Sequence, residues 1–194
     1  MADPTKHVQV VVVGGGFAGT YAAKELARHG VEVALVDTNG YQTFQPMLYQ
    51  AATGITAISD IEYPLTDIPK VEAIKDTVTS VDLANSTVTL AGGATLEADY
   101  IVVATGATVN FFGTTGAAEF AFPLYTSDDA SRIGQRGKEL VESGKNFAVA
   151  VMLAAPVGRT VHEVRPCAAG GSFHSCDLNS GHRREWRTRR RWGR

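Results

Sequence analysis

The stretch that decides the fold runs Val8-Gln-Val-Val-Val-Val13 and continues directly into Gly14-Gly-Gly-Phe-Ala-Gly19. Its first half is almost entirely β-branched, which is typical of a strand that is buried on both faces of a parallel sheet. The residues that follow, 20–29, carry alanine and leucine at helical spacing and end at Gly30. We therefore predict a strand, a tight glycine-rich turn and a helix, in that order.

The glycines follow the spacing G-x-G-x-x-G, and each has its own physical role. Gly14 permits the tight turn, Gly16 lets the backbone approach a pyrophosphate, and Gly19 lets the helix pack closely on the strand. The helix N-terminus offers free N–H groups to phosphate oxygens. A second strand, 31–36, ends in Asp37, where a carboxylate can accept hydrogen bonds from a ribose diol. The pattern indicates a dinucleotide site; the alternative is an ordinary βαβ unit with a glycine-rich turn.

Composition and charge set the limits of the interpretation. A chain of 194 residues with 44% hydrophobic content is long enough for one domain with a real core. The net charge of −2 conceals an acidic part, 1–155, and an arginine-rich part, 156–194, that contains no lysine. The N-terminus has no signal-peptide pattern, and no apolar run is of membrane-spanning length. We therefore expect a cytoplasmic protein whose two cysteines are reduced.

The middle of the chain changes its pattern twice. Residues 41–50 are rich in aromatic and amide side chains, and we expect this loop to lie beside the cofactor crevice, although it could equally be a surface loop. A short helix is predicted at 47–53. Alternating apolar residues then predict a small antiparallel β-meander at about 70–98. A third buried strand, 99–104, follows it.

The last predicted elements lie between residues 126 and 153. Thr126 and Asp129 have the spacing of a capping box, which predicts the start of a helix that reaches Ser143 and ends at Gly144. A fourth buried strand is predicted at 147–153.

Three of these segments together resemble the type II (non-proton-pumping) NADH dehydrogenases, which are flavoproteins with two dinucleotide-binding domains. They are residues 11–24, 39–54 and 102–107, and the Thr43-Phe-Gln-Pro-Met-Leu-Tyr-Gln50 part is the most specific. The resemblance covers about residues 7–152. It implies an α/β fold for residues 1–152: a Rossmann-like, doubly wound parallel sheet for FAD or NAD(P), with the β-meander inserted.

The resemblance also implies FAD as the cofactor, NADH as the electron donor and a quinone as the acceptor. The glycine-rich turn would hold the FAD pyrophosphate, Asp37 the adenosine ribose and Val78 the adenine; Gln45 and Pro46 would lie near the flavin. No side chain is identified as a catalytic acid, base or nucleophile, and no metal is expected. The implied cofactor-binding residues are Gly14, Gly15, Gly16, Phe17, Ala18, Gly19, Asp37, Gln45, Pro46, Val78, Thr105 and Gly106.

The cysteines narrow the implied chemistry. Disulfide reductases and sulfide:quinone reductases of this superfamily use cysteines, whereas residues 1–155 contain none. The pattern therefore excludes a thiol relay from the matching part and favours hydride transfer to the flavin, followed by electron transfer to a quinone.

The resemblance stops near residue 152. The family opens its NADH-binding unit there with a second glycine-rich turn, but this sequence has Leu153 and Ala155 in place of glycines. We interpret residues 153–194 as a basic tail that is disordered or arises from a shifted reading frame. Members of the family lie on the cytoplasmic face of the membrane, and the anchoring part has no counterpart here. The alternative function is therefore a non-catalytic, truncated fragment that binds FAD.

Two further interpretations of the tail carry less weight. A zinc site is not expected, because the spacing of its histidines and cysteines matches no usual ligand pattern. The second interpretation concerns the basic, tryptophan-containing stretch 182–192, which could contact nucleic acid or an anionic membrane. We expect no nucleic-acid role for it, because a basic tail is more often unselected or disordered. The residues considered for zinc are His162, Cys167, His174, Cys176 and His182.

Overall fold

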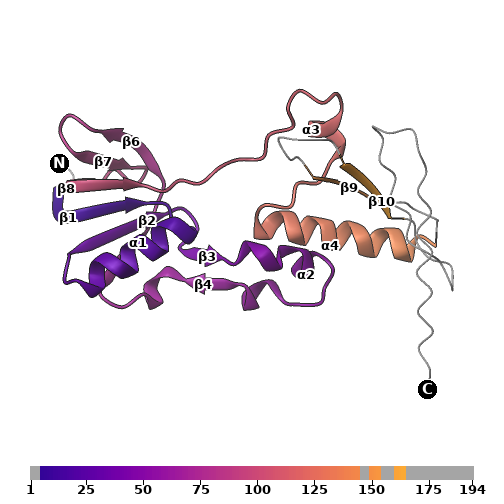
Figure 1. Ribbon diagram of the computed structural model, residues 1–194, viewed down its shortest axis with the longest axis horizontal. Helices are drawn as coiled ribbons and strands as arrows, with labels where there is room; N and C mark the ends of the chain where they lie inside the picture. The colour runs from indigo at the N-terminus through magenta and orange to yellow at the C-terminus, as the bar shows by residue number, and fades with distance from the viewer. Residues whose placement is uncertain (1–4, 145–148, 154–159, 165–194) are drawn as a thin grey trace, which may run out of the picture. The chain divides into compact units, whose positions relative to one another are not determined.

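The computed structural model describes residues 5–144, 149–153 and 160–164 (Figure 1). The chain forms two compact units. Unit 1 comprises residues 1–110 and 122–134, and unit 2 comprises residues 111–121 and 135–194. Unit 1 contains the glycine-rich turn and therefore the predicted dinucleotide site.

Unit 1 is built on a six-stranded sheet with the order β5-β2-β1-β8-β7-β6. Its parallel strands are β5 (Val71–Lys75), β2 (Val33–Asp37), β1 (Thr5–Val13) and β8 (Thr95–Val103). The antiparallel strands are β7 (Thr87–Leu90) and β6 (Val78–Asp82). This confirms the predicted α/β class with a Rossmann-like sheet in which parallel pairing dominates.

Strand β1 lies inside the sheet, and this explains its continuous apolar sequence. Val11 packs with residues of β2, β7 and β8 in one core cluster, whereas Val12 packs with residues of α1 and β2 in another. Both side chains are completely buried. A strand that is covered on both faces can have no polar alternation.

Helix α1 (Phe17–Arg28) buries Ala23 and Ala27 and ends before Gly30, whose φ of 81° suits glycine. It begins three residues earlier than predicted, because Gly16 serves as its N-cap.

The segment after β2 contains short elements. Strands β3 (Tyr41–Thr43) and β4 (Glu62–Pro64) pair with each other, and α2 (Leu48–Ala52) lies between them, as the predicted short helix does. Single 3-10 turns are η1 (Gln45–Met47), η2 (Ile58–Asp60) and η3 (Leu65–Asp67).

Helix α4 (Ser127–Glu142) packs on this region through its first half. Ala130 joins Leu48, Ala52 and Ile61 in a buried cluster. A Cβ on Gly134 would lie 3.1 Å from the carbonyl oxygen of Ala52, so the two helices approach closely there. Helix α4 therefore holds the segment 41–50, which the sequence predicts to lie beside the cofactor, through its contacts with α2.

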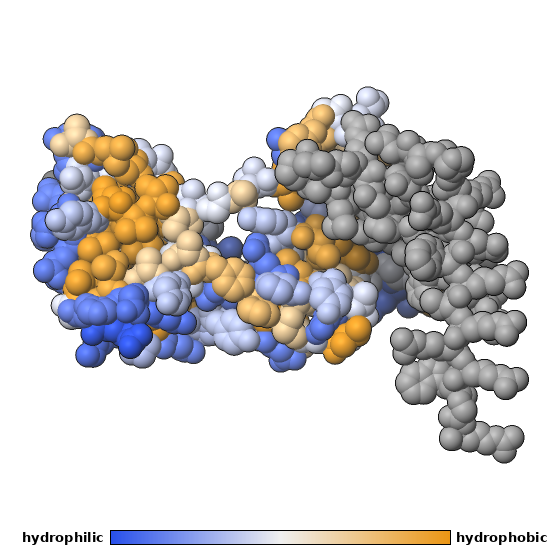
Figure 2. Space-filling model, viewed as in Figure 1, coloured by the Kyte–Doolittle hydropathy of each residue, from blue (hydrophilic) through white to orange (hydrophobic). Residues whose placement is uncertain are grey.

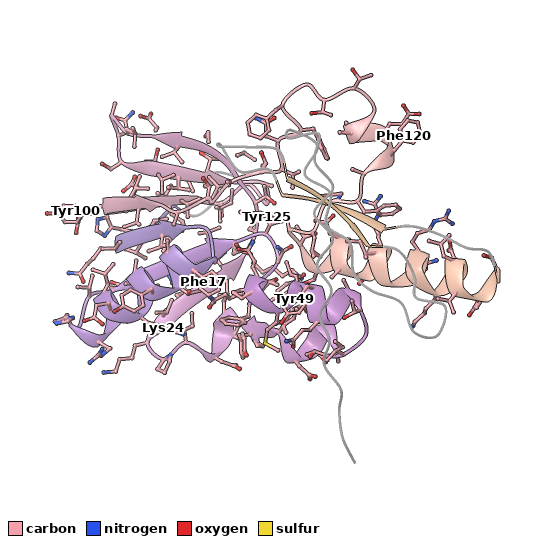
Figure 3. The ribbon with its side chains drawn as sticks, turned by 45° about the vertical axis from the view of Figure 1, so that its right-hand side comes forward. Phe17, Lys24, Tyr49, Tyr100, Phe120 and Tyr125 are labelled. Carbon is pink, nitrogen blue, oxygen red and sulfur yellow. The ribbon has the colours of Figure 1, made fainter. Side chains whose placement is uncertain are left out.

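Two predictions about the sheet were wrong in detail. Strand β5 pairs in parallel with β2, so the antiparallel part begins at Val78 rather than near residue 70. Strand β8 is not buried along its second half, since Tyr100 is 73% and Val103 62% exposed. The reason is that β7 pairs only with residues 95–97 of β8, and among the described residues only β1 pairs with the rest. Figure 3 shows Tyr100 projecting outward, and Figure 2 shows apolar residues gathered over this sheet.

Unit 2 contains α3 (Ala117–Phe120), the second half of α4, and the strands β9 (Val149–Leu153) and β10 (Thr160–Val164). The predicted strand at 147–153 exists as β9, but it pairs antiparallel with β10, and the described pairings do not join it to the six-stranded sheet. Strand β10 falls in the segment 153–194, which the sequence analysis interprets as a basic tail that is disordered or arises from a shifted reading frame; that interpretation stays a prediction. Cys167, His174, Cys176, His182 and the basic stretch 182–192 lie outside the described residues.

Among the described helices, none combines the length and the apolar composition that a bilayer crossing requires.

The first prediction concerns the packing of α1. A Cβ on Gly19 would lie 1.8 Å from the carbonyl oxygen of Gly14, which is a backbone atom. Gly19→Ala should therefore lower the free energy of unfolding by about 1–3 kcal/mol. The control is Gly137→Ala in α4, where a Cβ meets nothing within 4 Å; it should raise stability by about 0.5–1 kcal/mol. Urea unfolding followed by circular dichroism measures both, and equal effects would contradict the packing argument.

The second prediction concerns the N-terminus of α4. The Asp129 amide donates to Thr126 Oγ1 at 3.2 Å, and the Thr126 amide donates to Asp129 Oδ2 at 2.9 Å, which confirms the predicted capping box. Thr126→Ala should cost about 1 kcal/mol of unfolding free energy. Ser131→Ala, at an exposed position inside the same helix, should change stability by less than about 0.5 kcal/mol. The same unfolding assay distinguishes the two, and a neutral Thr126→Ala would show that the cap is dispensable.

Candidate dinucleotide site

The glycine-rich turn lies where three parallel strands end. The Gly14 amide donates to the carbonyl oxygen of Val36 at 2.8 Å, and the Ala104 amide donates to that of Val13 at 2.8 Å. Gly14 has a φ of 104°, and a Cβ on it would lie 2.3 Å from the Ala104 carbonyl oxygen. No other residue type could bring the ends of β1, β2 and β8 this close together.

The glycines after Gly14 have different surroundings. A Cβ on Gly15 would lie 2.5 Å from Leu65 Cδ1, so Gly15 is needed for packing within the protein. Gly16 is exposed, and a Cβ on it would meet nothing within 4 Å. The protein itself therefore does not require glycine at residue 16, and the open backbone there is available to a ligand.

The N-terminus of α1 suits an anion. Its first turn contains no acidic residue, so no side chain of the helix itself neutralises the positive end of the helix dipole. Phe17 and Ala18, both predicted site residues, are exposed in this turn. The Phe17 ring packs edge-to-face against the Phe44 ring, with 5.7 Å between the ring centroids, and this contact joins the turn to the predicted cofactor loop.

Asp37 lies at the end of β2, directly beside the turn. Its Oδ2 accepts a hydrogen bond from the Gly15 amide at 2.8 Å, and its Oδ1 accepts from the Asn39 amide at 2.8 Å and the Gly40 amide at 3.3 Å. The carboxylate is only partly buried. It is therefore held in a fixed orientation while part of it still faces solvent.

The structure brings Gly106 and Gln45 together through a residue that the sequence did not single out. Gly106, with a φ of 73°, follows β8, and a Cβ on it would lie 3.7 Å from Tyr125 Oη. Gln45 Nε2 donates to the carbonyl oxygen of Tyr125 at 3.2 Å. Thr43 and Ser127 hydroxyls lie 3.3 Å apart beside this contact. Ser127 is the first residue of α4, and Tyr125 lies two residues before it. From the sequence, only a helix start was predicted there.

The remaining predicted residues are not all brought to the turn. Thr105 lies next to Gly14, since a Cβ on Gly14 would lie 3.2 Å from Thr105 Cα. Pro46 lies in η1. Val78 begins β6, at the edge of the sheet, and packs against the core cluster that contains Val11. Two residues before Val78, the amide of Asp76 donates to the carbonyl oxygen of Asp37 at 3.1 Å.

The electrostatic surroundings keep Tyr41 protonated. Burial raises the pKa of this phenol, and Glu62 raises it further as a negative neighbour and hydrogen-bond partner; Asp128 and Asp37 add smaller effects. Tyr41 is thus a neutral hydrogen-bonding group at neutral pH and has no role as a base.

The site as a whole consists of backbone N–H groups, one oriented carboxylate and small residues. It contains no nucleophile paired with a base, and among residues 5–144 and the two described strands beyond them no cluster of potential metal ligands occurs. Such an arrangement can bind a pyrophosphate and a ribose, but it leaves the chemistry to whatever is bound.

Comparison with known proteins agrees with this geometry. Residues 8–151 match the family described as pyridine nucleotide-disulphide oxidoreductase. The chain is 36% identical over 142 residues to the type II NADH:quinone oxidoreductase Ndh of Mycobacterium tuberculosis, covering 70% of this chain and 31% of that protein.

Solved structures give the same result for the fold. The sulfide:quinone oxidoreductase of Aquifex aeolicus has a TM-score of 0.63 at 30% identity, covering 71% of this chain and 33% of that one. NDH2 of Plasmodium falciparum, solved in complex with NADH, has a TM-score of 0.64 at 20% identity and covers 71% and 30%, respectively. This chain thus spans about a third of the length of the proteins that it matches. Because the family match covers most of the chain and includes the glycine-rich turn, the chain belongs to the pyridine nucleotide-disulphide oxidoreductase family.

Proposed function

We propose that residues 1–152 are the FAD-binding part of an oxidoreductase that passes electrons from NADH through FAD to a quinone. The observation that carries the proposal is the pairing of an open backbone at Gly16 with an oriented carboxylate at Asp37 on the same edge of the sheet. Its second support is the similarity to the M. tuberculosis protein, whose name describes an NADH:quinone oxidoreductase.

The residues fit FAD group by group. The amides at the start of α1 would bind the pyrophosphate, with Gly16 leaving room for it, and Asp37 would accept a ribose hydroxyl. Thr105 and Gly106, which follow β8, and Gln45 and Pro46 in η1 would border the rest of the cofactor. When bound, FAD supplies the redox chemistry, accepting a hydride and passing electrons on.

The protein side contributes binding and orientation. Phe17 and Phe44 would restrict the loop beside the cofactor, and Tyr125 would hold Gln45 and limit the space at Gly106. No thiol occurs in residues 1–155, so the proposed route needs none. The proposed location is cytoplasmic, and a quinone acceptor would bring the protein to a membrane surface, because quinones partition into lipid.

A second candidate function is FAD binding without catalysis. It is favoured by Leu153 and Ala155, which replace glycines where a second dinucleotide turn would begin. Under this alternative the chain holds the cofactor but has no donor site of its own.

The third prediction tests FAD binding. The purified chain should show the visible absorption bands of bound flavin, and Gly16→Ala should weaken FAD binding by tenfold or more, because the Cβ would occupy the space of the pyrophosphate. Fluorescence titration with FAD measures the loss. Gly16→Ala should lower the free energy of unfolding by no more than about 1 kcal/mol, because alanine is a poorer N-cap than glycine but its Cβ meets no protein atom within 4 Å. A protein that binds no FAD, or a Gly16→Ala variant with wild-type affinity, would reject this site.

The fourth prediction separates the two candidate functions. NADH is added under anaerobic conditions to the chain loaded with FAD. Bleaching of the flavin bands at a rate that rises with NADH concentration would support the oxidoreductase. A flavin that dithionite reduces but NADH does not would support the cofactor-binding alternative.

A further inference from the structure

Asp37 has more hydrogen bonds than a ribose acceptor needs. Both of its carboxylate oxygens already accept backbone N–H groups: Oδ2 from Gly15, and Oδ1 from Asn39 and Gly40. A carboxylate offers about four acceptor positions, so these bonds leave about one for a ligand hydroxyl.

The bond to Gly15 is the one that reaches the glycine-rich turn. Two hydrogen bonds tie this turn to the end of β2. One joins the amide of Gly14 to the carbonyl oxygen of Val36 at 2.8 Å, and the other joins the amide of Gly15 to Asp37 Oδ2. Only the bond between Gly15 and Asp37 depends on a side chain. Leu65 lies so close to Gly15 that the Gly15 amide has little room to turn toward another acceptor.

We infer that Asp37 is a positioning residue that holds the glycine-rich turn in its binding conformation before any ligand arrives. The inference rests on the proposed FAD site and assigns Asp37 a second role there, distinct from contact with the ribose. With the turn held, the amides that follow Gly15 are oriented in advance, so binding does not have to order them.

Asparagine cannot replace this carboxylate. Backbone N–H groups meet both oxygens, and an amide offers one oxygen and one NH₂ group, which is a donor. In Asp37→Asn, the single remaining oxygen keeps two hydrogen bonds if it faces the Asn39 and Gly40 amides but only one if it faces Gly15. The NH₂ group is therefore expected to face Gly15, and the bond to the turn is the one that is lost. A purely ribose-binding Asp37 would not affect the ligand-free turn in this way.

The first test uses the ligand-free protein. Amide hydrogen exchange, resolved by NMR, should be at least tenfold faster at Gly15 in Asp37→Asn than in the wild type. Exchange at Val12 and Leu35, in the buried strands, should be unchanged. The matched control is Asp76→Asn: Asp76 also accepts backbone N–H groups, from Thr77 at 2.6 Å and Gly92 at 3.1 Å, but it does not contact the turn. Equal exchange at Gly15 in all three proteins would overturn the inference.

A measurement on the wild type needs no substitution. A scalar coupling across the hydrogen bond, between the Gly15 amide nitrogen and the Asp37 carboxyl carbon, should be detectable in the ligand-free protein. This protects the test against an Asp37→Asn variant that does not fold. With that coupling absent, the bond would not exist in solution and the inference would be wrong.

The second test separates the two roles of Asp37. FAD and an analogue that lacks both adenosine ribose hydroxyls are titrated into wild type and Asp37→Asn. Positioning predicts that the variant still binds the analogue several-fold more weakly than the wild type does. A loss that disappears with the analogue would mean that Asp37 acts through the ribose alone. Failure of the wild type to bind FAD would instead reject the proposed function, while the exchange experiment would still decide the role of Asp37.

Discussion

The close approach of α1 to the end of β1 is the constraint on which the rest of unit 1 depends. A Cβ on Gly19 would lie 1.8 Å from the Gly14 carbonyl oxygen, so the helix can begin where it does only because residue 19 has no side chain. This fixes the helix N-terminus over the ends of β1, β2 and β8. The position of the helix also determines what surrounds it. Because the carboxyl ends of parallel strands meet at one edge of the sheet, Asp37, Thr105 and the free backbone of Gly16 lie together there.

A site built in this way binds a ligand mainly through backbone N–H groups, and reactive side chains contribute little to it. The described residues near the turn contribute amides, a carboxylate and a neutral phenol, and none forms a nucleophile–base pair. Such a site would leave the reaction to a bound cofactor, while the protein supplies position and electrostatics. A fold of this kind can therefore serve proteins with different donors and acceptors.

The loop beside the site is held by contacts far apart in the sequence. Phe44 contacts Phe17, Gln45 donates to Tyr125, and α2 packs against α4 where Gly134 removes a side chain. The start of α4, fixed by its capping box, therefore does more than begin a helix. Tyr125, directly before the cap, accepts a hydrogen bond from Gln45 at its carbonyl oxygen, and a Cβ on Gly106 would lie 3.7 Å from its hydroxyl oxygen.

The sequence by itself determined the strand–turn–helix–strand unit, the carboxylate at its end and the capping box at Thr126, because each depends on local spacing. It could not determine which strands are neighbours. The predicted placement of β5 in the meander was wrong, and so was the predicted burial of Tyr100. Alternation and apolar content do not reveal which strand lies next to another in the sheet. Tyr125 was missed for the same reason: its contacts with Gln45 and Gly106 join segments that only tertiary packing brings together.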